Sequence, residues 1–264
     1  MAQIGRLIGA GQECEIFEGD SGRVVRIARA GGPATDFAAQ AVAMGAARAG
    51  GLPVPAVHEL FEVDGRPAMV IDRVEGPDAL SRLGARPWEL VRLARLTGSL
   101  QADLHRVVAP PDLPRLRELV PDLLSEPAIP DGVRLRTRQR LEGLPDGDRL
   151  LHGDFHPGNV LLGLHGPVVI DWPNAVSGPP AADLAMTVLI LRVASPDDDP
   201  GRAQQLLLAA ARRAYVRIHL TAALAGEGSA ASRDEVAAWM PIMAALRLRD
   251  GTASERQTLL RLAA

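Results

Sequence analysis

The chain has no lysine and only one cysteine, Cys14, among its 264 residues. A single cysteine excludes a disulfide within the chain. Because all 29 basic residues are arginines, any role that proteins commonly assign to lysine must fall to an arginine or stay vacant. The net charge of −3 argues against a general nucleic-acid binder, which needs a basic face.

The sequence also lacks any stretch close to the ~20 apolar residues that span a bilayer. Its longest apolar segment, residues 181–193, is interrupted by Asp183 and Arg192 and predicts a buried helix. The first residues do not show the basic-then-apolar pattern of an export signal. We therefore expect a cytoplasmic protein that makes no membrane contact, with 47% hydrophobic residues to build its core.

The N-terminal part predicts a small sheet with one helix. Glycine-rich turns and short β-branched runs alternate along residues 1–29, as in antiparallel strands. An Ala-rich stretch predicts a helix over 35–49, and Asp64-Gly65 predicts a hairpin turn. We expect turns at 9–11 and 19–22, and strands at 14–17, 24–27, 57–63 and 67–71.

After a connector at residues 72–77 the pattern becomes mainly helical. Apolar residues at helical spacing predict a long helix from Pro87 to Val107, and a β-loop-β segment occupies 149–172. Ser232 and Ser254, each followed three residues later by Glu or Gln, predict two capping boxes. Further helices are expected at 114–124, 133–144, 181–194, 201–224, 233–249 and 255–263.

The β-loop-β segment carries the chemistry. Asp154 and Asn159 lie five residues apart on its loop, and Asp171 follows twelve residues later, after the strand-like run Val168-Val169-Ile170. A carboxylate can take the proton of a hydroxyl, and carboxylate or amide oxygens can hold Mg²⁺ on a nucleotide. The spacing therefore favours phosphoryl transfer.

The motif His152-Gly153-Asp154-Phe155-His156 permits a second interpretation, a metal-dependent hydrolase, because imidazole and carboxylate suit zinc or iron. Such a site needs further ligands downstream. The later histidines, His165 and His219, lie in no supporting motif, so phosphoryl transfer remains the preferred interpretation.

The two motifs, His152 to Asn159 and Ile170-Asp171-Trp172, resemble those of the aminoglycoside phosphotransferase family, small-molecule kinases with a protein-kinase-like fold. The resemblance covers nearly the whole chain. It implies an α+β, two-lobed protein with a small antiparallel-sheet lobe at 1–73 and a larger helical lobe at 74–264. It further implies transfer of the γ-phosphate of ATP, or of GTP, to a hydroxylated small molecule, with aminoglycosides and other antibiotics as candidate acceptors and antibiotic resistance as a candidate role.

The resemblance also implies residue roles. Asp154 would accept or orient the hydroxyl proton, and Asn159 and Asp171 would hold Mg²⁺. The supporting residues would be His152, His156 and Asp183, which brace the catalytic loop or lie beside its aspartate. The implied nucleotide contacts are Gly9, Ala10, Gly11, Gln12 and Arg26 for the phosphates, and Met69, Asp72 and Val74 for the purine.

Arg26 departs from the protein-kinase pattern, which places a lysine in this strand and pairs it with a helix glutamate. The best-aligned helix position here is Gln40, so Asp36 or Glu15 would have to supply the missing charge. Arginine can bind phosphate in a bidentate manner, so phosphate binding need not be lost. The departure leaves a nucleotide-binding pseudokinase as an alternative, which the intact Asp154 argues against.

Overall fold

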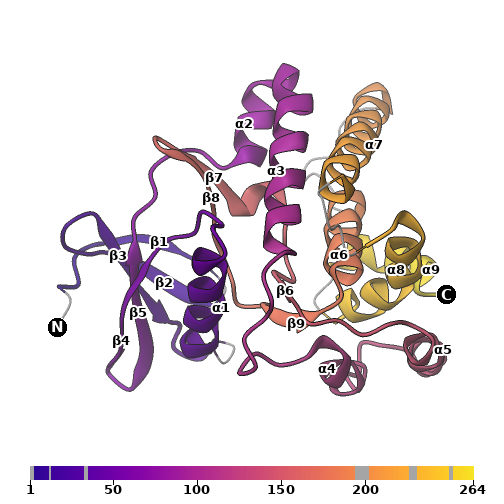
Figure 1. Cartoon of the computed structure of the whole chain (residues 1–264), viewed down its shortest axis with the longest axis horizontal. Coiled ribbons are helices and arrows are strands. Elements are labelled where there is room, and N and C mark those ends of the chain that lie inside the picture. Colours follow the sequence, from indigo (N-terminus) through magenta and orange to yellow (C-terminus); the bar gives the residue numbers. More distant parts are fainter. Residues whose placement is uncertain (1–2, 12, 33–34, 194–201, 226–230, 250–251) are drawn as a thin grey trace.

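The computed structural model describes residues 3–11, 13–32, 35–193, 202–225, 231–249 and 252–264. Within them a five-stranded antiparallel sheet with one helix forms a small lobe, and mainly helices form a larger lobe (Figure 1). This confirms the predicted α+β, two-lobed architecture. None of the helices in these ranges combines the length and the hydropathy needed to cross a bilayer.

The small lobe has the strand order β1-β2-β3-β5-β4, and neighbouring strands run antiparallel. Its helix α1 lies between the sheet and the larger lobe (Figure 1) and begins after Asp36, whose carboxylate accepts the N–H of Ala39. The elements are β1 (Leu7–Ala10), β2 (Cys14–Glu18), β3 (Arg23–Ala28), α1 (Phe37–Ala49), β4 (Val57–Val63) and β5 (Arg66–Asp72).

The turn expected at residues 9–11 is wrong for its first two residues. Strand β1 runs through Ala10, with Gly9 opposite Ile16 and Ala10 opposite Glu15. A register shift after Leu7 acts as a bulge that keeps the glycine in the strand. The turn begins at Gly11, whose N–H donates to the carbonyl of Cys14 at 2.9 Å.

In the larger lobe, α3 and α7 pack side by side and α6 packs against α8 (Figure 1). Two strand pairs, β6–β9 and β7–β8, lie between the helices and the sheet. The helices are α2 (Ala79–Ala85), α3 (Leu90–Leu104), α4 (Leu116–Leu123), α5 (Asp131–Glu142), α6 (Pro180–Val193), α7 (Arg202–Leu224), α8 (Arg233–Arg247) and α9 (Ala253–Ala263). The short elements are the 3-10 turns η1 (Pro87–Glu89) and η2 (Pro157–Asn159), and strands β6 (Arg149–Leu151), β7 (Val160–Gly163), β8 (Gly166–Val169) and β9 (Val176–Gly178).

Of the two predicted capping boxes, the one at Ser232 is confirmed, because Ser232 and Glu235 satisfy each other's backbone N–H groups. The box at Ser254 is wrong. Helix α9 starts two residues earlier than predicted, with Thr252 as its N-cap and Glu255 as the reciprocal partner. Glutamate offers this partner position a charged acceptor, which bonds the N-cap N–H more strongly than a neutral amide does.

The connector between the lobes is held close to the catalytic segment. Gly76 has φ of 141°, and a Cβ there would lie 2.3 Å from the carbonyl oxygen of Leu162. The adjacent Pro77 accepts the N–H of Leu162 at 2.9 Å. Only glycine fits this approach, which fixes the connector against β7, the strand that follows Asn159.

Candidate functional site

Asp154, Asn159 and the end of β8 form one hydrogen-bonded unit. The Asn159 side-chain N–H₂ donates to the carbonyl of Asp154 at 2.9 Å and lies 3.4 Å from its Oδ2. The backbone carbonyl of Asn159 accepts the N–H of Ile170 at 3.0 Å. Since Ile170 immediately precedes Asp171, the loop and the strand end that carries Asp171 cannot move independently.

The buried side chain of His152 hydrogen-bonds to the same unit. It is fully buried, its Nε2 lies 3.0 Å from the carbonyl of Ile170, and its Nδ1 accepts the N–H of Asp154 at 3.3 Å. Burial lowers the pKa of His152, which matches a neutral ring that donates once and accepts once. The predicted bracing role of His152 therefore has a structural basis.

His156 lies beside Asp154, as the resemblance implied. Its Nδ1 accepts the N–H of Gly158 at 3.0 Å, and its Nε2 lies 3.7 Å from the Oδ2 atom of Asp154. His152 and His156 therefore each accept a backbone N–H of the catalytic loop through Nδ1. Within the described ranges, no three His, Cys, Asp or Glu side chains converge as a metal-binding cluster. The hydrolase interpretation has no further ligands there.

Asp171 stands at the end of β8 with φ of 66°, a left-handed conformation that non-glycine residues rarely adopt. Its side chain is 46% exposed, and its Oδ1 lies 3.4 Å from Nη2 of Arg26. Such a conformation costs of order 1 kcal/mol and persists where the surroundings impose it. The hydrogen bonds to Ile170 impose it here, and they present the carboxylate to the space between the lobes.

Asp183, on α6, holds the catalytic loop from behind. Its Oδ1 accepts the N–H of Gly153 at 2.8 Å, and its Oδ2 accepts from Gln101 at 2.8 Å and from His105 at 2.9 Å. Burial alone would raise the pKa of Asp183, but the hydrogen bond from His105 and its neighbours lowers it below the ordinary value. A buried carboxylate with three donors is a rigid anchor.

A chain of buried polar groups extends this anchor into α3 and α7. His219 Nε2 lies 2.8 Å from the side-chain oxygen of Gln101, and its Nδ1 lies 3.0 Å from the hydroxyl of Thr97. That hydroxyl also lies 2.8 Å from the hydroxyl of Tyr215. Sequence reasoning missed this chain, because its members lie far apart in sequence and in no shared motif.

The buried histidines predict a loss of stability in mild acid. Burial lowers the pKa of His219 from 6.5 to about 4, and it lowers that of His152 as well. Between these pH values the unfolded chain binds protons that the folded chain does not, so stability should fall as the pH falls from 6.5 to 4. The expected slope is about 1.4 kcal/mol per pH unit for each histidine.

Urea unfolding at a series of pH values measures this slope. His219→Gln keeps a hydrogen-bond donor and an acceptor but cannot titrate. It should reduce the slope of stability against pH by about 1.4 kcal/mol per pH unit. His165→Gln at an exposed position should leave the slope as in the native protein. An unchanged slope in His219→Gln would contradict the assignment of a neutral, buried His219.

Arg26 has the neighbours of a phosphate-binding residue but none of the compensating charges that the sequence suggested. It is buried, its guanidinium contacts Gln40 Oε1 at 3.2 Å, and Cys14 Sγ lies 3.4 Å from it. Asp36 instead caps α1, and Glu15 pairs with Arg66 at 3.0 Å. All contacts of Arg26 exceed the ~2.8 Å typical of charge-assisted hydrogen bonds, which leaves its donors available to an anion.

Glu13 is a carboxylate of this site that sequence reasoning missed. Burial, together with the negative charges of Asp171 and Asp154, raises the pKa of Glu13, while Arg26 opposes the shift. Carboxylates from the turn after β1, the catalytic loop and the end of β8 therefore share one region. These carboxylates are near enough for their charges to influence Glu13, although among the described residues they do not converge as a metal-binding cluster.

A cavity of about 360 Å³ lies between the two lobes, and its lining includes Arg26, Asp171 and Gly11. Its apolar walls come from both lobes and include Ile8, Val24, Ile71, Leu161 and Ile170. A cavity with apolar walls and a few charged groups suits an aromatic base that carries an anionic group.

The connector supplies this cavity with free backbone groups at Val74, which no described residue hydrogen-bonds. The N–H of Asp72 instead donates to the carbonyl of Ala56 at 3.1 Å. Met69 is fully buried and does not line the cavity, and the lining methionine is Met44 of α1. Gln12 lies outside the described residues.

A second cavity, of about 380 Å³, is lined mainly by the larger lobe and also by Asp36 and Ala39 of the small lobe. Asp154 and Gly153 line it, whereas Asp171 lines the first cavity. Asn159 and Ile170 link the segments that carry these two carboxylates, so the catalytic motifs contribute one carboxylate to each cavity. Each cavity is large enough for a small molecule.

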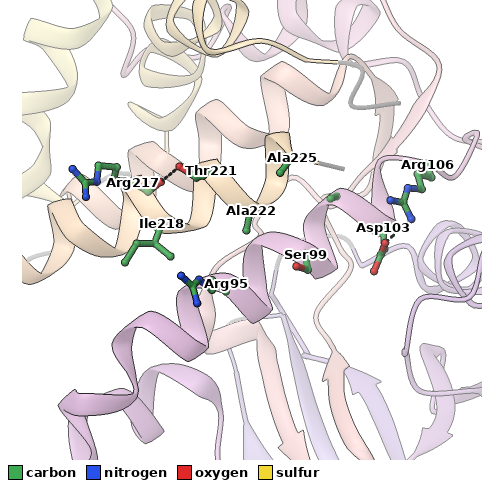
Figure 2. Close-up of a pocket in the computed structure, with 10 residues that line it drawn as sticks. Arg95, Ser99, Asp103, Arg106, Arg217, Ile218, Thr221, Ala222 and Ala225 are labelled. Atoms are coloured by element: carbon green, nitrogen blue, oxygen red, sulfur yellow. Dashed lines mark hydrogen bonds and ion pairs between the residues drawn. The ribbon is translucent and has the colours of Figure 1, made fainter. Parts of the chain in front are cut away.

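A further groove, of about 600 Å³, lies between α3 and α7 (Figure 2). Its charged side chains do not converge, because Arg106 pairs with Asp103 at 2.9 Å and Arg217 points away from Arg106 (Figure 2). No residue of the catalytic motifs lines it. We therefore place the functional site at the two cavities that Asp171 and Asp154 line.

Comparisons with known proteins agree with this geometry. Among curated proteins, none matches the sequence. A choline/ethanolamine kinase family protein from Mesorhizobium loti shares the fold at 17% identity and a TM-score of 0.62, covering 99% of this chain and 87% of that chain. An amicoumacin kinase in complex with AMP-PNP, Ca²⁺ and Ami shares it at 15% identity and a TM-score of 0.62, covering 99% and 86%.

An aminoglycoside phosphotransferase from Streptomyces rimosus, in complex with ADP and streptomycin, shares the fold at 19% identity and a TM-score of 0.55, covering 88% of this chain and 90% of that chain. The profile of the phosphotransferase enzyme family matches residues 8–220, which include both lobes and both catalytic motifs. The chain therefore belongs to the phosphotransferase enzyme family and is a small-molecule kinase with a protein-kinase-like fold.

Proposed function

We propose that the protein transfers the γ-phosphate of ATP, with Mg²⁺, to a hydroxyl of a small molecule. GTP is the alternative donor, and aminoglycosides and other antibiotics are among the candidate acceptors. Residues 1–73 and part of the cleft would hold the nucleotide, and residues 74–264 would supply the catalytic loop and the acceptor cavity. The observation that carries the proposal is that Asp171 lines one cavity while Asp154, in the segment hydrogen-bonded to it, lines the other.

The donor set suits a hard cation. The side-chain nitrogen of Asn159 is committed to Asp154, but no described residue donates to its amide oxygen. Asp171 presents a half-exposed carboxylate in the same region. Amide and carboxylate oxygens are ligands that Mg²⁺ prefers, so Asn159 and Asp171 would hold it. When bound, Mg²⁺ would neutralise charge on the β- and γ-phosphates.

The residues of the chain have separate tasks in the transfer. Asp154 holds the acceptor hydroxyl and takes its proton as the hydroxyl oxygen bonds to the γ-phosphorus, while the bond from that phosphorus to the bridging oxygen of ADP breaks. Arg26 binds phosphate oxygens with donors that are only loosely engaged in the free protein. Val74 offers backbone groups to the purine, and His152, His156 and Asp183 keep the loop in place.

Two relatives support the choice of ligands without fixing them. The amicoumacin kinase holds a triphosphate analogue and a divalent cation, and the Streptomyces rimosus enzyme holds ADP and an antibiotic. At 15% and 19% identity, these relatives support a shared fold. The acceptor of this protein has to be found by experiment.

Titration calorimetry of ATP with and without Mg²⁺ tests the proposal. We expect Mg²⁺ to tighten ATP binding, and we expect Asp171→Asn to remove most of that gain, by about 10- to 100-fold. Asparagine tolerates the left-handed conformation of this position, so the backbone should be unchanged.

The matched control is Asp64→Asn, which makes the same change at another left-handed aspartate, with φ of 51°, in the turn between β4 and β5. It should bind Mg-ATP like the native protein. ATP binding that is equally tight with and without Mg²⁺ in the native protein would contradict the proposal.

A further inference from the structure

We propose that the acceptor carries an anionic group, of the carboxylate type, and that Arg247 recognises it. This rests on the proposed function, because it assigns the acceptor to the second cavity, and it narrows the substrate class of that site. Arg247 lies on α8 and lines the cavity together with Asp154.

Arg247 holds a buried donor without a partner. The Nε atom of its guanidinium is buried, and no described residue accepts a hydrogen bond from it or forms an ion pair with it. A cationic donor that is removed from water without a partner is costly, because the desolvation is not offset. Arginine prefers to meet a planar anion such as a carboxylate, which accepts two of its N–H groups at once.

Four aspartates line the cavity, Asp36, Asp112, Asp154 and Asp183, and none of them forms an ion pair with Arg247. Asp154 is the carboxylate that takes the hydroxyl proton. Asp36 is exposed and accepts the N–H of Ala39 at 2.9 Å, and Asp112 is exposed to solvent. Asp183 is fully committed to Gly153 and its other donors. Exposed carboxylates are screened by water and contribute little to binding a charge, whereas a partly buried guanidinium acts at lower dielectric.

The other walls of this cavity are mainly apolar. They include Leu116, Leu119, Leu123, Met186, Met243 and Leu246. A polycationic acceptor would leave its amines unpaired against these side chains and would face the charge of Arg247. A hydroxylated acceptor with an apolar body and an anionic end satisfies the hydroxyl site, the walls and the arginine together.

Three matched compounds test this: an ω-hydroxy carboxylate, the diol and the ω-amino alcohol of the same chain length, each in lengths of four, six, eight and ten carbons. We expect phosphorylation of the hydroxy acid at one or more lengths, with kcat/KM about 10- to 100-fold above that of the diol and with the amino alcohol lowest. Arg247→Met should remove the preference by raising KM for the acid far more than it raises KM for the diol.

Arg247→Lys should restore part of the preference, because it keeps a charge without the planar fork. Arg217→Met, an exposed arginine of the groove between α3 and α7, should behave like the native protein (Figure 2). Equal use of acid and diol, or preference for the amino alcohol, would overturn the role of Arg247. An acid preference that Arg247→Met leaves intact would overturn it as well.

Ligand-observed NMR of the same compounds, recorded without nucleotide, separates this inference from the proposed function. Binding of the acids that is lost in Arg247→Met, without transfer at any length, would support Arg247 and count against the proposed transfer. Transfer to diols and amino alcohols at least equal to transfer to the acids would support the proposed function and overturn the anionic acceptor. No binding of any hydroxy acid would also overturn it.

Discussion

Asp154→Asn should lower kcat for acceptor phosphorylation by about 10³-fold, within the range of general base catalysis. Asparagine keeps the size of the side chain but cannot take the hydroxyl proton. The loop should keep its shape, because the contacts that hold it use the backbone N–H and carbonyl of Asp154. Steady-state kinetics with Mg-ATP and any acceptor that the native protein accepts measures the effect.

Calorimetric affinity for Mg-ATP and the urea midpoint are the controls for Asp154→Asn, and both should match the native protein. A kcat within about tenfold of the native value would mean that Asp154 is not the base. A lost affinity for Mg-ATP would instead assign Asp154 to the metal site that we give to Asn159 and Asp171.

Asp183→Ala should destabilise the fold by about 3 kcal/mol. The substitution leaves the donors of Gln101 and His105 buried without their acceptor and frees the N–H of Gly153. Gly153 cannot adapt easily, because with φ of 77° it lies against Asn174, whose carbonyl oxygen would be 2.3 Å from a Cβ. Urea unfolding at pH 7.5 measures the change.

Asp146→Ala is the matched control for Asp183→Ala. Asp146 also accepts a charged donor, from Arg115 at 2.7 Å, but both side chains are partly exposed. Surface pairs of this kind contribute about 0–1 kcal/mol, so the control should change stability little. Similar losses in the two variants would show that the buried anchor has no special role.

The catalytic motifs could be predicted because their chemistry is local in sequence. Asp154 and Asn159 share one loop, and Asp171 ends the strand that pairs with the strand after that loop. The hairpin around Asp64-Gly65 was predictable for the same reason, since a two-residue turn fixes its own register. Local patterns misled at Gly9 and Ala10, which belong to β1, and before α9, where Thr252 is the N-cap in place of Ser254.

The supporting polar network could not be predicted, because its partners are distant in sequence. Gln101 meets Asp183 and His219 only after α3, α6 and α7 have packed together. The environment of Arg26 has the same origin: Gln40 was predicted, whereas the contact to Cys14 depends on the pairing of β2 with β3, and the contact to Asp171 depends on how β3 faces the larger lobe. Burial decided these cases, and a sequence pattern does not report which polar atoms lose their water.

The account is tested most directly by following the γ-phosphate itself. Native protein would be incubated with γ-labelled ATP, Mg²⁺ and a panel of aminoglycosides, macrolides, amino alcohols, sugars and hydroxy acids, with Asp154→Asn in parallel. The account predicts label in a phosphomonoester of at least one acceptor, dependent on Mg²⁺ and lost in the variant. Tight Mg-ATP binding with no label transferred to any acceptor would contradict it and favour the nucleotide-binding pseudokinase.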